Sequence, residues 1–522
     1  MSAVSPQAIV PGYQTTPPTA IRFMHEHTYG TATEVSTLRS PPCREDRYTS
    51  GSWNPDKSGW PPDRQRSFSR GIASWVADGS KGGCTMLRVA VATLGCKVNH
   101  YESAGIVEEL EAQGISVVPF TSPADLYIVN TCTITAKTDF QSRQLVRRAY
   151  RTNPGASIIV TGCYAQIAPQ ELAALPGVRM VVGTEMKESL PEIIRDVTGE
   201  GQRINVGDIS LKRTFSGLPV TRFPGQTRAY LKVQDGCNTF CSYCIIPYAR
   251  GRSRSLPEGD VIRQVRTLAQ AGHREIILTG ICLGAYGRDL PSPTDLLGLL
   301  QKIEEDTDIE RLRISSMHPT DISEEMIAHL QGSKIVCRHL HLSLQSGDDR
   351  ILGLMRRDYT TGQVADLVTR LQAAIPGIAI GMDVITGFPG EGEEEFQNTA
   401  HFLENIRLAY LHVFPYSRRP GTTASSLPDQ VMKSVSKERA ALLRGIGGRK
   451  RIAFNGGFLG KALSVLVEGT GDKETGWMKG FSDNYVPVLI PEGDPSLANH
   501  IVAVTGDHMI KEKVVGRIVT DG

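Results

Sequence analysis

The sequence contains no apolar run long enough to span a bilayer, and its first residues lack the basic-then-apolar pattern of a secretory signal. It also has little net charge, +2 over 522 residues, so no global field attracts a polyanion. These absences argue against a membrane or secreted protein and favour a cytoplasmic one. Any nucleic acid would have to bind through local patches of basic residues. The composition, 40% hydrophobic and 21% charged, is that of a globular protein, and the length predicts roughly three to four domains.

Residues 1–85 lack a helical or strand period and are rich in Pro, Ser and Arg, as in RSPPCREDR. Such a composition buries too little apolar surface to offset the entropy of ordering. We expect either a disordered tail or a misassigned start, with translation from Met86, where a strand-like run begins. The seven acidic residues in this segment argue against an organellar presequence. Cys43 and Cys84 lie here and receive no function.

Beyond residue 86, apolar runs of strand length alternate with helical stretches, which predicts a parallel sheet with helices on both faces. The expected strands are Val89–Leu94, Leu126–Asn130 and Ser157–Thr161, and the expected helices are Tyr101–Gln113 and Thr138–Tyr150. Arg143, Arg147 and Arg151 share one face of the second helix. A solvated face is the ordinary interpretation of these arginines, and a phosphate-contacting face is the alternative.

Each of the three predicted strands ends in a cysteine: Cys96 in TLGC, Cys132 in VNTC and Cys163 in VTGC. Ligands of open α/β sheets bind in the crevice at the carboxyl ends of the strands. The three cysteines are therefore candidates to converge at one edge of the sheet. The alternative is that they are single buried cysteines, which are common in protein cores.

A different arrangement of cysteines stands in DGCNTFCSYCIIPYARG, where Cys237, Cys241 and Cys244 have the spacing C-x3-C-x2-C. Thiolates are soft ligands that suit iron–sulfur clusters, and three of them leave one iron of a [4Fe–4S] cluster open to another ligand. A zinc knuckle and a disulfide are the alternatives. Structural zinc needs four ligands, and no fourth Cys or His lies nearby in the sequence. In a cytosolic protein, ten cysteines are also more typical of metal ligands than of disulfides.

Residues near 200–225 have the composition of a linker, and the next 200 residues alternate strands and helices again. Repeated βα units predict a barrel or partial barrel, with its site at the carboxyl ends of the strands. The cluster loop follows the first of these strands, Arg228–Gln234. The expected later strands are Glu275–Thr279, Arg311–Ser315, His339–Leu344, Ile378–Ile385 and Tyr410–Tyr416, and the expected helices are Asp260–Ala271, Leu296–Asp306, Ser323–Leu330, Thr361–Ala374 and Glu393–Asn405.

Polar residues and glycines at these strand ends, among them Gly280, Gln345 and Asp383, suit a nucleoside-bearing cofactor, although any one of them could be a turn residue. His339 and His341 point to one side of a strand, but no third metal ligand is evident, so we expect packed or hydrogen-bonded histidines. Cys282 and Cys337 are expected to be ordinary core residues.

The last 70 residues follow a helix at Lys433–Arg451 and contain short β-rich runs between Gly, Asp and Asn turns. They predict a small antiparallel β-barrel. The expected strands are Ala462–Glu468, Tyr485–Ile490, His500–Thr505 and Val514–Val519. Trp477 and Tyr485 are candidates to stack on nucleic-acid bases, although a lone aromatic residue is more often part of the core.

Taken in this order, the three regions resemble the radical-SAM methylthiotransferases, whose last domain is the TRAM module associated with tRNA binding. The strings that carry the resemblance are TLGCKVNHYES, VNTCTIT, VTGCYAQ, DGCNTFCSYCIIPYARG, LHLSLQSGDDRIL, GFPGE and FPYSRRPGT. The implied fold is an open, flavodoxin-like α/β domain over 86–205, a radical-SAM partial (βα) barrel over 223–445 and a TRAM β-barrel over 450–520.

The resemblance also implies the cofactors and their chemistry. Cys237, Cys241 and Cys244 would hold a [4Fe–4S] cluster whose open iron binds S-adenosyl-L-methionine, and reductive cleavage would yield a 5′-deoxyadenosyl radical. Cys96, Cys132 and Cys163 would hold a second, auxiliary [4Fe–4S] cluster that carries the sulfur to be methylated and transferred. Tyr243 would lie against the cofactor. Gly280, Gln345 and Asp383 are candidate S-adenosylmethionine contacts.

The context of Cys96, GCKVN, is similar to the branch that modifies N6-threonylcarbamoyladenosine at position 37 of tRNA. The expected reaction is addition of a methylthio group to carbon 2 of that adenine, with tRNA and an electron donor as partners and no membrane. The alternatives are the same chemistry on isopentenyladenosine in tRNA or on a ribosomal-protein aspartate. A structural Fe–S protein that binds RNA without catalysis is the alternative of a different class.

Overall fold

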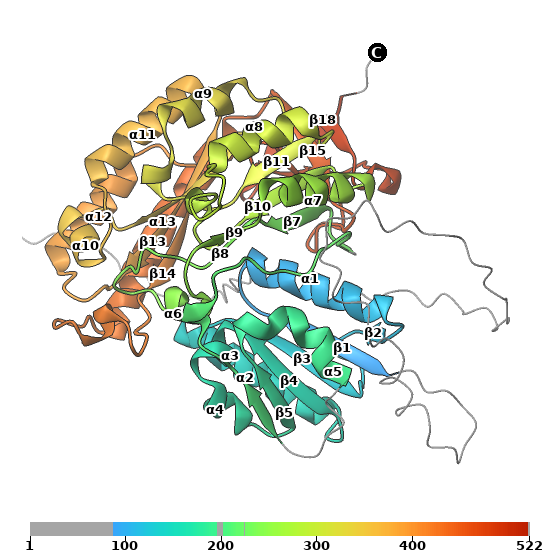
Figure 1. Cartoon of the computed structure of the whole chain (residues 1–522). Coiled ribbons are helices and arrows are strands. Elements are labelled where there is room, and N and C mark those ends of the chain that lie inside the picture. Colours follow the sequence, from blue (N-terminus) through green and yellow to red (C-terminus); the bar gives the residue numbers. More distant parts are fainter. Residues whose placement is uncertain (1–86, 196–201, 224, 520–522) are drawn as a thin grey trace, which may run out of the picture. The chain divides into compact units, whose positions relative to one another are not determined.

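The computed structural model describes residues 87–195, 202–223 and 225–519 (Figure 1). The predictions for residues 1–85, including Cys43 and Cys84, lie outside these ranges. Over the same ranges, no helix is both long and apolar enough to cross a membrane.

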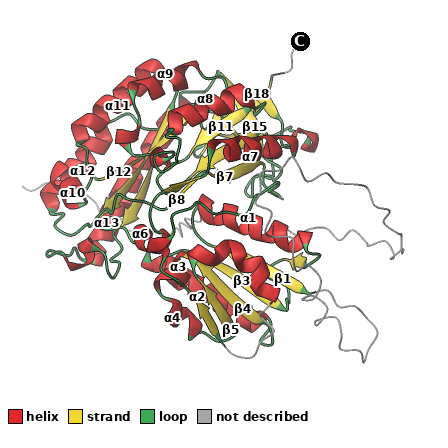
Figure 2. Ribbon diagram, in the orientation of Figure 1, coloured by secondary structure: helices red, strands yellow, loops and turns green. Residues whose placement is uncertain are grey.

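The first domain is built on a sheet with the strand order β2-β1-β3-β4-β5-β6, in which every pairing is parallel (Figures 1 and 2). Its strands are β1 (Arg88–Thr93), β2 (Ser116–Val118), β3 (Leu126–Thr131), β4 (Ser157–Gly162), β5 (Val178–Val182) and β6 (Arg203–Asn205). The order 2-1-3-4-5 is that of flavodoxin-like sheets, so the predicted fold is confirmed. β6 was not predicted as a strand, because residues near 200–225 have the composition of a linker, but residues 203–205 pair with β5 and extend the sheet.

Alternate side chains of these strands enter two separate cores, as a parallel sheet covered on both faces requires. One core joins Ile128 and Ile159 to Ile106 of α1 (Lys97–Ala112) and to α5 (Leu190–Arg195). The other joins Val129 and Val160 to α2 (Ala136–Thr152), α3 (Cys163–Ile167) and α4 (Pro169–Ala173). The predicted covering of both faces by helices is confirmed.

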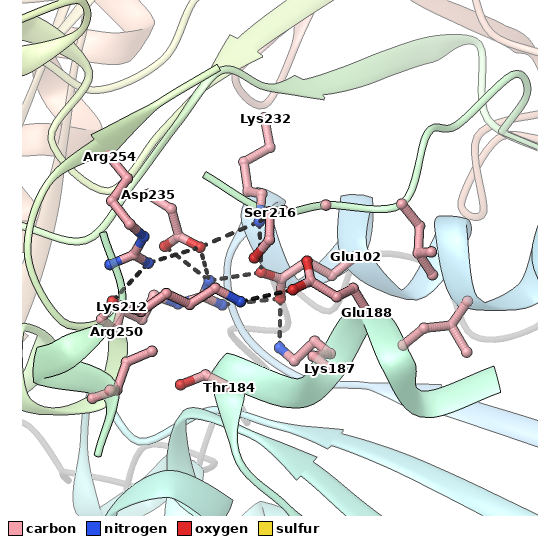
Figure 3. A pocket seen from close by; sticks show the side chains of 14 residues that line it. Glu102, Thr184, Lys187, Glu188, Lys212, Ser216, Lys232, Asp235, Arg250 and Arg254 are labelled. Carbon is pink, nitrogen blue, oxygen red and sulfur yellow. Dashed lines mark hydrogen bonds and ion pairs between the residues drawn. The ribbon is translucent and has the colours of Figure 1, made fainter. Parts of the chain in front are cut away.

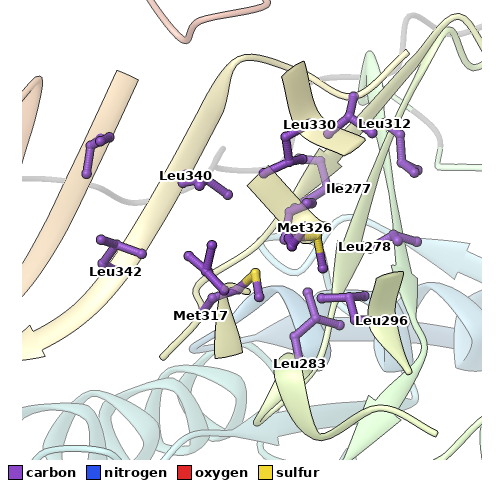
Figure 4. Packing of buried hydrophobic residues seen from close by; sticks show 14 of the residues in the cluster. Ile277, Leu278, Leu283, Leu296, Leu312, Met317, Met326, Leu330, Leu340 and Leu342 are labelled. Carbon is purple, nitrogen blue, oxygen red and sulfur yellow. The ribbon is translucent and has the colours of Figure 1, made fainter. Parts of the chain in front are cut away.

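The central domain is a partial barrel of parallel strands in two sheets, β11-β10-β7 and β12-β13-β14. Its strands are β7 (Arg228–Lys232), β10 (Glu275–Thr279), β11 (Arg311–Ile314), β12 (His339–Gln345), β13 (Ala379–Thr386) and β14 (Tyr410–Pro415). Isolated parallel bridges, Met317 to Leu342 and Leu312 to Val336, continue the curve from the first sheet to the second. Buried apolar side chains from both sheets, including Ile277, Leu340 and Leu342, share one core with Met317 (Figure 4).

Helices separate these strands close to where periodicity predicted them, and three of the predicted ranges match the structure at both ends. The helices are α7 (Glu258–Gln270), α8 (Leu296–Asp306), α9 (Glu324–Gly332), α11 (Thr361–Ala374), α12 (Glu393–Asn405) and α13 (Lys433–Gly456). Two short helices were missed, α6 (Ile246–Arg250) inside the cluster loop and α10 (Asp349–Leu354), because so few residues show no helical period. A ribbon of β8 (Gln234–Asp235) and β9 (Arg254–Ser255) brackets the cluster loop.

The C-terminal domain is a closed barrel with the order β15-β16-β17-β19-β18. Its strands are β15 (Ala462–Val467), β16 (Met478–Ser482), β17 (Pro487–Ile490), β18 (Ile501–Ile510) and β19 (Lys513–Ile518). The predicted small barrel is confirmed, with two differences: β16 was not foreseen, and β17 pairs with β19 in parallel while the other pairings are antiparallel.

Buried charges fasten this small barrel to the amino-terminal ends of β10 and β11. The Arg313 guanidinium, 2% exposed, donates to Glu275 Oε1 at 2.7 Å and to the carbonyl of Asp483 at 3.0 Å, and Arg311 donates to the carbonyl of Ser464 at 2.7 Å. The cluster loop, by contrast, follows the carboxyl end of β7.

Candidate functional site

The loop that carries Cys237, Cys241 and Cys244 is closed tightly at its base by backbone. Cys237 N donates to the carbonyl of Gly251 at 3.0 Å, and Cys244 N donates to the carbonyl of Cys241 at 3.0 Å. Gly236 has φ +72, and a Cβ there would collide with the backbone of Arg252, so only glycine fits this approach. The three thiols are half-buried, and all eight described cysteines are free, which removes the disulfide alternative for the described residues.

An arginine from another part of the barrel contacts this set. Arg357, 8% exposed, donates to Cys241 Sγ at 3.3 Å while its other nitrogens bond the Tyr359 hydroxyl at 2.8 Å and the carbonyl of Ser343 at 2.9 Å. The Cys241 sulfur therefore lies beside a fixed positive charge.

The neighbour that sequence reasoning missed is Cys282, which follows β10 and was expected to be an ordinary core residue. It is buried as expected, but its thiol hydrogen-bonds Cys237, and that bond, with help from Thr239, lowers the pKa of Cys237 to about 6. Ligand atoms of Cys282, His318 and Asp321 also lie within 4.8 Å of one another. The pattern that singled out Cys96, Cys132 and Cys163, a cysteine just after a strand, also applies to Cys282.

The second set of cysteines is brought together at one edge of the first sheet, as predicted. Gly95 has φ +105, and a Cβ there would lie 2.8 Å from Cys132 Sγ, so the end of β1 touches the end of β3. Gly162, with φ +98, lies equally close to the backbone of β3. Burial, reinforced by the neighbouring sulfurs of Cys163 and Cys96, raises the pKa of Cys132 to about 12. These glycines immediately precede Cys96 and Cys163, and they allow the strand ends to approach.

Arg250, the last residue of α6, reaches from the cluster loop to this second set. Its Nε donates to Cys163 Sγ at 3.2 Å, its Nη1 to Glu102 Oε1 at 2.7 Å and to Asp235 Oδ1 at 3.2 Å, and its Nη2 to Asn99 Oδ1 at 2.5 Å and to Glu102 Oε2 at 3.1 Å. Figure 3 shows the Arg250, Glu102 and Asp235 side chains converging. The two cysteine sites are thus linked by a single buried side chain.

Further charged groups surround the two carboxylates of this network. Lys187 Nζ lies 2.5 Å from Glu102 Oε2, and Lys232 Nζ lies 3.2 Å from both Glu102 and Asp235 (Figure 3). Burial opposes ionisation of both carboxyls, but the cations prevail: they hold the pKa of Glu102 well below its usual range and lower that of Asp235 to about 2. Both carboxylates are therefore ionised at neutral pH.

The chemistry of the donors fits iron–sulfur clusters at both places. Each set offers three free thiols, and each places one buried guanidinium against one of its sulfurs. Such a cation compensates the negative charge that thiolate ligands carry.

The remaining candidate contacts lie at or near the carboxyl ends of barrel strands. Tyr243 packs edge-on against Phe388, with ring centroids 6.4 Å apart. Gly280 faces the side chain of Gln234, whose Oε1 accepts from Cys282 N at 2.8 Å. Gln345 has φ +72 at an irregularity in the β12–β13 register. Their roles as cofactor contacts stay predictions.

Asp383 is engaged by histidines of the neighbouring strands. His341 Nε2 lies 2.9 Å and His412 Nδ1 lies 3.4 Å from Asp383 Oδ1. His341 Nδ1 and His339 Nε2 both lie within hydrogen-bond distance of the Tyr410 hydroxyl, at 3.1 and 2.7 Å, which confirms hydrogen-bonded histidines. The sequence showed no further metal ligand near His341, because His412 is 71 residues away along the chain. His341, Asp383 and His412 have the donor chemistry of a divalent transition-metal site.

Some of the side chains that are candidates for nucleic-acid contact interact with other residues of the protein. Arg143 Nη1 pairs with Glu171 at 2.8 Å and donates to the Tyr164 hydroxyl, whereas Arg151 is exposed. Tyr485 is half-buried between the Arg313 guanidinium, 4.9 Å from its centroid, and the His339 ring. Tyr485 thus packs in the manner of a core residue, and Trp477 is half-buried.

Residues 88–183 match the model of an uncharacterized protein family, UPF0004, and residues 231–403 match the radical SAM superfamily. The threonylcarbamoyladenosine tRNA methylthiotransferase MtaB of Bacillus subtilis is 41% identical over 423 residues, which cover 80% of this chain and 93% of that protein. The protein of the same name from Aquifex aeolicus is 40% identical over 73% of this chain and 93% of that protein. A tRNA-2-methylthio-N(6)-dimethylallyladenosine synthase from Pelotomaculum thermopropionicum is 34% identical over 80% and 95%.

Proposed function

This chain belongs to the radical-SAM methylthiotransferases, and we propose that it adds a methylthio group to carbon 2 of N6-threonylcarbamoyladenosine at position 37 of tRNA. The observation that carries the substrate is the 41% identity to an enzyme named for threonylcarbamoyladenosine, over 93% of that enzyme. The GCKVN context of Cys96 agrees with it.

S-adenosyl-L-methionine and a [4Fe–4S] cluster come with the radical-SAM family. We assign the ligands of this cluster to Cys237, Cys241 and Cys244. When bound, the pair supplies one-electron chemistry that activates the C2–H bond of adenine, which no acid–base pair does at neutral pH. The chain holds the three sulfurs in a backbone-closed loop and places the Arg357 guanidinium against Cys241 Sγ.

A second [4Fe–4S] cluster on Cys96, Cys132 and Cys163 is the further part of the proposal. When bound, it supplies the sulfur that is methylated and transferred. The support is that three free thiols from separate strands are gathered at one sheet edge, beside the cationic Arg250.

Four residues are proposed to contact S-adenosylmethionine: Tyr243, Gly280, Gln345 and Asp383.

The proposed partners are tRNA, through the anticodon-loop adenosine 37, and an electron donor. The proposed domains are 86–205, 223–445 and 450–520, of which the last is the TRAM barrel.

Nucleoside analysis of tRNA tests the substrate. Total tRNA from a strain lacking this gene, and from that strain carrying the gene on a plasmid, is digested and analysed by mass spectrometry. We expect 2-methylthio-N6-threonylcarbamoyladenosine to be absent from the deletion strain and restored by the plasmid. Its persistence in the deletion strain would overturn the proposal.

Isopentenyladenosine in tRNA is a second candidate substrate, because the dimethylallyladenosine synthase above is 34% identical over 95% of its length. The same digest decides between the two. Loss of the 2-methylthio derivative of isopentenyladenosine, with the threonylcarbamoyl derivative intact, would favour this second substrate.

A further inference from the structure

Arg250 is the most completely engaged buried side chain at the junction of the two cysteine sites. It is 1% exposed, and its five N–H donors are distributed over Cys163, Glu102, Asp235 and Asn99. Three of these partners come from the first domain, and Asp235 immediately precedes the cluster loop of the second. Arg250 therefore fixes the cluster loop against the edge where Cys96, Cys132 and Cys163 meet.

The charges around Arg250 do not balance among themselves. Four cations are linked by contacts of 4 Å or less to only two carboxylates, Glu102 and Asp235; the cations are Lys187, Lys232, Arg250 and Arg254. All four cationic side chains are at most 6% exposed. Buried charge is costly unless it is compensated, so this group calls for further negative charge within contact. Within the described part of the chain, the group that Arg250 Nε touches is the sulfur of Cys163.

A contact between an arginine and a cysteine sulfur also occurs at the other site. Arg357 contacts Cys241 Sγ at 3.3 Å, much as Arg250 contacts Cys163 Sγ at 3.2 Å. No carboxylate of the described residues forms an ion pair with Arg357, whereas Arg250 pairs with two. Because each arginine donates to one cysteine sulfur, substitution of Arg250 or of Arg357 perturbs one set of cysteines at a time.

We propose that Arg250 is a positioning residue for the second cluster: its Nε–H holds the Cys163 sulfur, and its charge makes reduction of that cluster easier. The proposal rests on the proposed function, because it presumes a [4Fe–4S] cluster on Cys96, Cys132 and Cys163. Reduction adds negative charge, which a nearby cation and a hydrogen bond to a ligand sulfur stabilise. Loss of Arg250 therefore shifts the reduction potential of the second cluster to more negative values.

The test measures the second cluster alone. In the chain with Cys237, Cys241 and Cys244 all changed to Ala, the remaining cluster is reconstituted anaerobically and its potential is determined by a redox titration followed by electron paramagnetic resonance. Arg250→Gln, which removes the charge, is expected to shift the midpoint to a more negative value. Arg250→Lys, which keeps the charge but loses the planar fork, is expected to shift it less. Arg357→Gln, at the other site, is expected to leave it unchanged.

The outcomes separate this inference from the proposed function. If the triple-alanine chain binds no iron, the second cluster itself is absent and the proposed function fails. If it binds the cluster and Arg250→Gln leaves the midpoint unchanged, or shifts it no more than Arg357→Gln does, the role of Arg250 is wrong. Should Arg250→Gln fail to fold because Glu102 and Asp235 lose one of their partners, Arg250→Lys decides: an unchanged midpoint overturns the proposal and a negative shift supports it.

Discussion

The two sets of cysteines reach similar arrangements by opposite routes. Cys237, Cys241 and Cys244 lie within eight residues, so one loop closed by backbone hydrogen bonds suffices to gather them. Cys96, Cys132 and Cys163 are separated by 36 and 31 residues, and they meet only because β1, β3 and β4 are neighbours in a parallel sheet. The first site is encoded by local spacing, and the second by topology.

The surroundings of the two sites differ as well. The loop cysteines and Cys96 are half-buried, whereas Cys132 and Cys163 are 2% and 3% exposed beside a buried network of charges. A site that binds and releases a cofactor needs access, while a site that passes on a sulfur gains from exclusion of water. The comparison agrees with the proposed division, in which the radical forms at the loop and the sulfur is transferred at the sheet edge.

The largest effect is expected from Cys241→Ala. Removal of one of the three loop thiols should abolish 5′-deoxyadenosine formation and methylthiolation together, because both depend on the cluster at the loop. Anaerobic assays of the reconstituted protein measure both products. The matched control is Cys337→Ala, which removes a buried thiol that belongs to neither set and should leave both activities near wild type.

Cys132→Ala should separate the two activities. It is expected to stop methylthiolation while much of the 5′-deoxyadenosine formation remains, and to lower the iron content by about half. Iron analysis and the same product assays measure this. Equal loss of 5′-deoxyadenosine in Cys132→Ala and Cys241→Ala would contradict the division of labour between the sites.

The sequence predicted most of the fold because periodicity and turn chemistry act locally. The ranges of α8, α11 and α12 follow from their apolar period, and the cysteine at the end of each strand indicated the shared edge. β16, Met478–Ser482, was missed because its five residues lack the alternation and β-branched side chains that mark a strand.

Side-chain partners far apart in sequence could not be predicted. Arg250 contacts Asn99 across 151 residues, and Cys282 contacts Cys237 across 45 residues. These contacts depend on how the folded domains and strands pack against one another. Composition and residue spacing carry no information about that packing. The cysteines could be predicted as ligands because the chemistry of grouped thiols restricts their function. An arginine in a sequence is most often a surface residue, so nothing marks the one that is buried.

A smaller effect, confined to the sheet edge, is expected from Gly95→Ala. A Cβ at this position would meet Cys132 Sγ, and the φ of +105 is strained for any side chain, so we expect a loss of about 1–3 kcal/mol in stability and poorer iron loading of the second site. Gly114→Ala is the matched control, since φ is +76 but nothing lies within 4 Å of the added Cβ. Equal iron content in both variants would show that crowding at the strand ends does not limit cluster loading.

The remaining prediction concerns the pH dependence of the charged network. The pKa of Asp235 falls from 3.8 to about 2 on folding, because Lys232 and Arg250 outweigh the effect of burial. A carboxyl with a depressed folded pKa stabilises the native state above its unfolded pKa and loses that contribution as the pH falls through the folded value. This contribution, about 2 kcal/mol, should therefore be present at neutral pH and disappear between about pH 4 and pH 2.

Thermal unfolding of the wild type and of Asp235→Asn across this pH window tests the point. The variant should unfold at a lower temperature than the wild type at pH 7, and the difference should shrink as the pH falls from about 4 to about 2. Asp366→Asn, at an exposed position of α11, should match the wild type throughout. A difference between Asp235→Asn and the wild type that persists undiminished at the lowest pH would mean that the carboxylate charge is not what stabilises the junction. The contrast between a half-buried loop and an electrostatically fixed sheet edge would then rest on packing alone.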